Sequence, residues 1–94
     1  MADPNDSPHS TFVQPRLNHR AIQALYRLSP PLDDGTEYVV VSGCVVMGEP
    51  EVYVFKSTET ADITSWSEID GSQRGTLDHE VALHDLGRPL RADE

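Results

Sequence analysis

The sequence predicts a single small α+β domain, in which a short antiparallel β-meander of two or three strands is flanked by an N-terminal and a C-terminal helix (α-β-β-β-α). An amphipathic helical pattern comes first, a nearly continuous β-branched run follows, and a second helical pattern closes the domain. With 94 residues the chain has room for one core. The predicted boundaries are one domain at residues 15–87, with flexible polar tails at 1–14 and 88–94.

The first helix is predicted over residues 15–28. Pro15 suits the first turn of a helix, because the N–H that proline lacks would have no partner there. The helix is expected to end before Pro30, since a residue preceding proline is pushed out of the α region. At 100° per residue one face of this segment is apolar, made of Leu17, Ala21, Ala24, Leu25 and Leu28.

A β-hairpin is predicted next. Residues 38–47 are almost continuously β-branched or apolar, which is typical of a strand buried on both faces. Residues 48–50 form a turn, and residues 52–55 alternate as a second strand. A third antiparallel strand is expected at residues 62–66, followed by a loop at 68–75.

The last helix is predicted over residues 77–86, with Thr76 as its cap and two acids, Asp78 and Glu80, in its first turn. The helix is expected either to be sandwiched or to turn one patch toward a partner, because its apolar residues occupy two sides. The two patches are Leu77, Val81 and His84 on one side, and Ala82, Leu83 and Leu86 on the other.

The net charge of −9 is unevenly distributed along the chain. Residues 1–28 hold two acids and three arginines, whereas residues 29–94 hold fourteen acids against four basic residues. This excess opposes direct binding to nucleic-acid phosphates and favours a protein partner with a basic surface. The acids expected on the partner-binding face are Glu49, Glu51, Glu59, Asp62, Glu68, Asp70, Asp78 and Glu80.

The predicted function is therefore that of a small non-enzymatic interaction protein. Its most concrete form is an inhibitor that occupies a basic nucleic-acid-binding surface in place of phosphates. An alternative is a homodimeric accessory domain that buries one patch of the last helix. No catalytic residue, metal or cofactor is predicted.

A metal-binding protein or small enzyme is the weaker alternative, and it would use Asp78, His79, Glu80 and His84. The spacing counts against it, because His79 and His84 are five residues apart and diverge by about 140° around a helix. Cys44 lies in a run of valines and is expected to be a core residue. Trp66 and Tyr53 could anchor a partner, but core packing is the interpretation favoured for Trp66.

A cytoplasmic location is expected. The chain has no apolar run of about 18 residues and no basic start followed by an apolar stretch. Its single cysteine cannot form an internal disulfide, which suits a reducing compartment. No association with membranes is predicted.

The segment from Pro50 to Gly87 combines a YVF strand, a W-x-E-[IL]-D-G-S turn and an LDHE helix start. It resembles a group of short uncharacterised bacterial and phage-borne proteins, a resemblance that implies no known activity. In size and acidity the whole chain is also similar to anti-CRISPR proteins, many of which are small, acidic and block nucleic-acid channels. The residues that carry the first resemblance are Tyr53, Val54, Phe55, Trp66, Glu68, Ile69, Asp70, Gly71, Ser72, Leu77, Asp78, His79 and Glu80.

Overall fold

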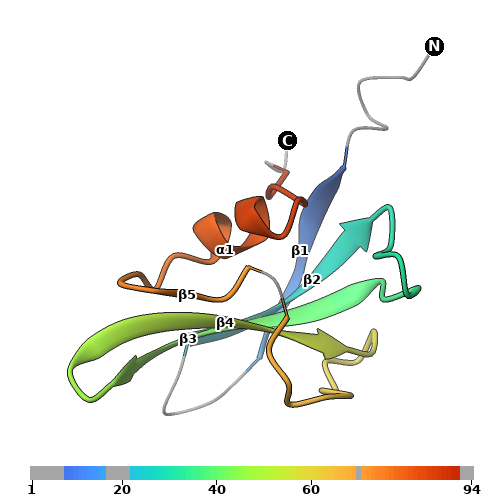
Figure 1. The fold of residues 1–94 in the computed structure, drawn as a ribbon. Helices are drawn as coiled ribbons and strands as arrows, with labels where there is room; N and C mark the ends of the chain where they lie inside the picture. The colour runs from blue at the N-terminus through green and yellow to red at the C-terminus, as the bar shows by residue number, and fades with distance from the viewer. Residues whose placement is uncertain (1–7, 17–21, 70, 92–94) are drawn as a thin grey trace.

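The computed structural model of the chain describes residues 8–16, 22–69 and 71–91 and consists mainly of one five-stranded antiparallel sheet (Figure 1). Each strand pairs with the next in sequence, in the order β1-β2-β3-β4-β5. The predicted three-stranded meander between two helices is therefore wrong. The elements are β1 His9–Arg16, β2 Ile22–Ser29, β3 Tyr38–Val46, β4 Glu49–Ser57, β5 Gln73–Arg74 and α1 His79–Asp85.

The predicted first helix, residues 15–28, is replaced in its described part by strands. β2 pairs with β3 from Ile22↔Gly43 to Arg27↔Tyr38. The strand is favoured over the helix because it also buries Tyr26, which a helix would place opposite its apolar face. Residues 17–21 of that prediction lie outside the described residues.

The predicted N-terminal tail also requires correction, because its residues from His9 onward belong to β1. β1 is an edge strand with a bulge between Phe12 and Gln14, and Pro15 is tolerated at such an edge. The predicted C-terminal tail runs beside it in part. The Ser10 N–H donates to the Pro89 carbonyl at 2.9 Å, and the Arg91 N–H donates to the Ser10 carbonyl at 2.8 Å.

The predicted hairpin is confirmed and is longer than expected, since β3 and β4 pair from Tyr38↔Ser57 to Val46↔Glu49. β3 is buried on both faces over residues 39–43. The strand predicted at residues 62–66 is wrong. That segment makes one isolated bridge, Ser57↔Ile63, and forms no strand of the sheet.

The sheet has two unlike faces. On the helix-covered face, Ala82 and Leu83 of α1 pack onto the valines of β3 and β4. On the other side, the open face, Ala61 and Ile63 cover a smaller cluster around Leu25 and Val40. The apolar core therefore lies between α1 and the sheet.

α1 is shorter than the predicted helix and begins later. Its cap is Asp78, whose carboxylate accepts the Glu80 N–H at 2.9 Å, and not Thr76. Ala82 and Leu83 point into the core, whereas Val81 points outward. Of the two predicted apolar patches, Ala82 and Leu83 thus face the sheet and Val81 and His84 face away from it, whereas Leu77 precedes the helix.

Ile69 and residues 71–74 lie along the outer edge of β4, between the open face and α1. The Ile69 N–H donates to the Val54 carbonyl at 2.9 Å, and the Val54 N–H donates to Ser72 Oγ at 3.0 Å. Gly71 has a φ of +101°, and a Cβ there would lie 2.6 Å from the Ala82 carbonyl oxygen. Glycine is required at this crossing point.

Candidate partner-binding surfaces

Exposed apolar side chains gather at the end of the sheet where the β3–β4 hairpin turns. Ile22 is 67% exposed and Met47, at the turn itself, is 99% exposed. A monomeric protein rarely leaves a contiguous group of large apolar side chains in water. We call this group the hairpin-end surface, and it consists of Ile22, Val45, Met47, Leu77 and Val81.

Gly43 brings these side chains together. It pairs with Ile22 across β2 and β3, and a Cβ at Gly43 would lie 3.1 Å from the Leu77 carbonyl oxygen. Leu77 therefore rests directly on the backbone of β3. Val45 is two residues further along the same face of that strand, and Val81 lies in the first turn of α1, which begins two residues after Leu77.

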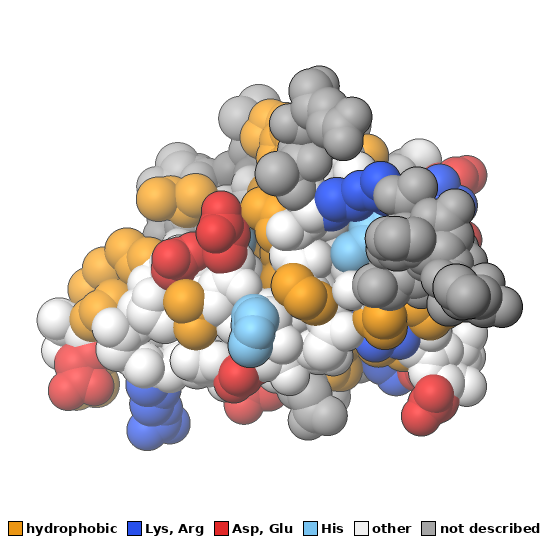
Figure 2. All heavy atoms as spheres, turned by 90° about the horizontal axis from the view of Figure 1, so that it is seen from above, with side chains coloured by type: hydrophobic (Ala, Val, Ile, Leu, Met, Phe, Trp, Pro, Cys, Tyr) orange, Lys and Arg blue, Asp and Glu red, His pale blue; other side chains and the backbone are white. Residues whose placement is uncertain are grey.

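Carboxylates border the hairpin-end surface. Asp78 and Glu80, both exposed, lie near Tyr26 at the start of α1, and their charges contribute to the raised pKa of its hydroxyl after the larger effect of burial. Glu49 is exposed beside the hairpin turn. In the left half of Figure 2, orange apolar side chains surround red carboxylates on this face.

His79 fastens the start of α1 to β2. Its Nε2 lies 3.0 Å from the Ile22 carbonyl oxygen and its Nδ1 lies 3.1 Å from the Tyr26 hydroxyl. Because a carbonyl only accepts, Nε2 carries the proton and Nδ1 accepts from Tyr26. Burial lowers the pKa of His79, which favours this neutral form.

Glu51 is sequestered and does not contribute to an exposed acidic surface. Only 7% of the residue is exposed. Its carboxylate accepts a hydrogen bond from the Tyr53 hydroxyl and lies 3.4 Å from Nε of Arg74. That hydrogen bond, with burial and the carboxylate charge, raises the pKa of Tyr53 to about 12.

The remaining predicted acids do not share one face. Glu59 and Asp62 lie in the turn after β4, at the opposite end of that strand from Glu49, roughly 26 Å away. Glu68 lies on the open face beside Tyr53. Asp70 lies outside the described residues. Of the predicted acids that the structure describes, Asp78, Glu80 and Glu49 border the hairpin-end surface.

The histidines weighed as metal ligands are not brought together. His79 is engaged by Tyr26 and Ile22, whereas His84 is exposed on the outer side of α1. Among the described residues, no three His, Cys, Asp or Glu side chains are arranged to hold a metal ion. Nor does any described helix have the length and apolar character needed to cross a membrane.

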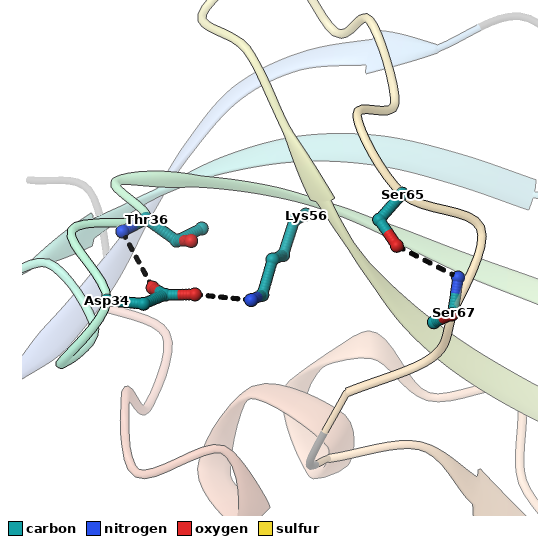
Figure 3. A network of polar contacts seen from close by, with 5 residues as sticks. All are labelled: Asp34, Thr36, Lys56, Ser65 and Ser67. Carbon is teal, nitrogen blue, oxygen red and sulfur yellow. Dashed lines mark hydrogen bonds and ion pairs between the residues drawn. The ribbon is translucent and has the colours of Figure 1, made fainter.

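A pocket of about 400 Å³ lies at the other end of the helix-covered face, but its basic groups are already engaged. Lys56 pairs with Asp34, which also accepts the Thr36 N–H at 3.0 Å (Figure 3). These contacts, the one with Lys56 first, hold the pKa of Asp34 well below its usual range. Arg88 donates from Nε to the Pro30 carbonyl at 2.8 Å.

Sequence reasoning missed Ile22 and Val45, because it placed the first in a helix and the second inside a buried strand. The strand prediction was correct, but β3 extends beyond the part of the sheet that α1 covers. The core interpretation of Trp66 is also wrong, since this side chain is 68% exposed. The outward patch of the last helix was the signal that pointed toward this surface.

Comparisons of the chain with protein-family models, with curated proteins and with solved structures found no match.

Proposed function

We propose that the protein is a small non-enzymatic interaction protein that docks through its hairpin-end surface onto a partner protein with a basic surface. The observation that carries the proposal is the contiguous exposure of Ile22, Val45, Leu77 and Val81, with Met47 at the tip. Burial of such side chains is the main source of binding free energy in protein interfaces.

The charge around this surface supports a basic partner. Asp78 and Glu80 border the apolar residues, and the whole chain carries −9. A second copy would bring like charges together, whereas lysine and arginine on a partner would be attracted. A homodimer is therefore the disfavoured alternative, and sedimentation tests it directly.

Inhibition is the form of this proposal that the sequence suggested. If the partner's basic surface is one that binds nucleic acid, docking displaces the nucleic acid. A cytoplasmic location is part of the same proposal and rests on the single cysteine, Cys44.

The test begins with capture from host lysate at low salt and continues with the purified captured protein. Val45→Lys combined with Val81→Lys is expected to weaken binding at least about tenfold, through lost apolar contact and charge repulsion. The control is Val13→Lys combined with Gln14→Lys, which adds the same charge at two exposed positions of β1. It should bind as the unmodified protein does.

Equal binding by the two double variants would refute the proposed surface. Affinity that is unchanged between low and high salt would refute the basic partner. A nucleic acid that binds the same partner without competing would refute the inhibitory form only.

A further inference from the structure

Half of the six aromatic residues in the chain form a row on the open face, away from the hairpin-end surface. The rings of Tyr53 and Phe55 are stacked, with centroids 6.1 Å apart and planes at 26°. Trp66 meets Phe55 edge to face at 5.5 Å. Although it makes this contact, Trp66 leaves 68% of its surface in water.

The segment that presents Trp66 is tied to β4 on both sides. The Thr64 N–H donates to the Lys56 carbonyl at 3.0 Å, and the Ile69 N–H donates to the Val54 carbonyl at 2.9 Å. Between them, the Ser67 N–H donates to Ser65 Oγ at 3.3 Å, which closes a turn around Trp66 (Figure 3). The exposed indole is therefore held in place and is not the tip of a free loop.

A carboxylate lies at the other end of the row. Glu68 and Tyr53 line a shallow pocket of about 150 Å³, together with Ser72, Gln73 and Arg74. Arg74 is paired with Glu51, with Nε and Oε1 3.4 Å apart. None of the described basic side chains forms an ion pair with Glu68.

We infer that Tyr53 and Glu68, at one end of the aromatic row, hold the guanidinium group of an arginine side chain on a partner protein, while Phe55 and Trp66 extend the ring surface for the segment that carries it. Aromatic faces attract cations, and the planar guanidinium both stacks on a ring and donates two parallel hydrogen bonds to a carboxylate. The pocket beside Tyr53 and Glu68, which neither Phe55 nor Trp66 lines, has the volume of about five waters at roughly 30 Å³ each, so it suits one side-chain head group and excludes a drug-sized ligand.

The inference does not depend on the hairpin-end surface, which lies on the other face of the sheet. Either site can fail its test without affecting the other. The net charge of −9 favours the approach of a cationic segment to both.

Trp66 is the only tryptophan and lies two rings along the row from this pocket, so its fluorescence reports a segment bound along the row. The probe is a short peptide with one arginine between glycines, compared with the same peptide carrying citrulline or lysine. The arginine peptide should give a saturable fluorescence change, and the neutral citrulline peptide should bind at least about fivefold more weakly. Equal binding of the arginine and citrulline peptides overturns the inference, and equal binding of the lysine peptide overturns its guanidinium selectivity.

Two charge-matched variants separate the site from general electrostatics. Glu68→Gln should weaken binding of the arginine peptide about fivefold, whereas Glu59→Gln, in the turn after β4, should leave it unchanged. Arg74→Gln should tighten binding about twofold, because it removes a competing cation from the pocket. Equal effects of the two glutamate variants would show that only net charge matters and would overturn the site. The three substituted side chains, Glu59, Glu68 and Arg74, are all exposed, so the variants are expected to fold. Urea midpoints equal to that of the unmodified protein verify this.

Discussion

Tyr26 and His79 are 53 residues apart in the chain, yet the Tyr26 hydroxyl lies 3.1 Å from Nδ1 of His79. Their rings also meet edge to face, with centroids 5.9 Å apart. This contact fixes the first residue of α1 against β2, and with it the neighbouring Asp78 and Glu80 beside Ile22. A residue that the sequence offers as a metal ligand therefore positions the border of the hairpin-end surface.

His79→Ala should lower the free energy of unfolding by roughly 1 to 2 kcal/mol, because it removes the partners of Tyr26 and of the Ile22 carbonyl. His84→Ala, at an exposed position of the same helix, should stay within about 0.5 kcal/mol of the unmodified protein. Urea unfolding near neutral pH measures both. Equal effects of the two substitutions would contradict a stabilising role for the contacts of His79 with Tyr26 and Ile22.

The same contact predicts a pH dependence. The lowered pKa of His79 means that the unfolded chain binds more protons than the folded one below about pH 6.5. The stability from His79 is therefore complete above that pH and is lost as the pH falls toward the folded pKa. Urea midpoints should fall less between about pH 7.5 and pH 5.5 in His79→Ala than in the unmodified protein. An identical fall of the urea midpoint in both proteins would contradict a neutral His79 in the folded state.

Gly71→Ala should destabilise the fold by about 2 to 3 kcal/mol, from its φ of +101° and the 2.6 Å approach to the Ala82 carbonyl oxygen. Gly75→Ala is the matched control, since Gly75 has a φ of +90° but nothing within 4 Å of an added Cβ. It should cost about 1 kcal/mol. Urea unfolding of both variants separates the steric clash with the Ala82 carbonyl from the cost of the positive φ. Equal losses of unfolding free energy in the two variants would contradict the close contact between Gly71 and α1.

The central hairpin could be predicted because residues 38–47 are rich in valine and are followed by Gly48, signals that are local in the chain. Local signals of this kind could not exclude the helix predicted over residues 15–28. Ala24, Leu25 and Leu28 fit one face of a helix, but they also fit a strand buried on both sides. Covering Leu25 requires Ala61 and Ile63, which arrive more than thirty residues later.

The candidate site was predictable only in part, for the same physical reason. The outward patch of the last helix follows from its period, so Leu77 and Val81 could be found. The faces on which the acids lie could not be predicted, because Ile69 and residues 71–74 lie along the β4 edge, between Glu68 and Asp78. The burial of Glu51 depends equally on Arg74, which β5 brings beside it.

Leu83→Ala should be the most damaging substitution in α1, at about 2 to 4 kcal/mol, because Leu83 is fully buried against β3 and β4. Val81→Ala, two residues earlier and 39% exposed, should change the free energy of unfolding by less than about 0.5 kcal/mol. Thermal and urea unfolding check the pair. A large loss from Val81→Ala would show that its side chain supports the fold and is not free for a partner.

Ionisation of Tyr53 tests the burial of Glu51. A pKa of about 12 keeps Tyr53 protonated at about pH 11, where an ordinary tyrosine is mostly ionised. Glu51→Gln removes the charge of the acceptor, so the pKa of Tyr53 should fall toward about 10 and Tyr53 should ionise by about pH 11. Ultraviolet difference absorbance follows the three tyrosines, Tyr53→Phe identifies the step, and Trp66 fluorescence confirms that the chain is still folded. If Glu51→Gln leaves the step that Tyr53→Phe identifies in place, the hydrogen bond to Glu51 is not what keeps Tyr53 protonated.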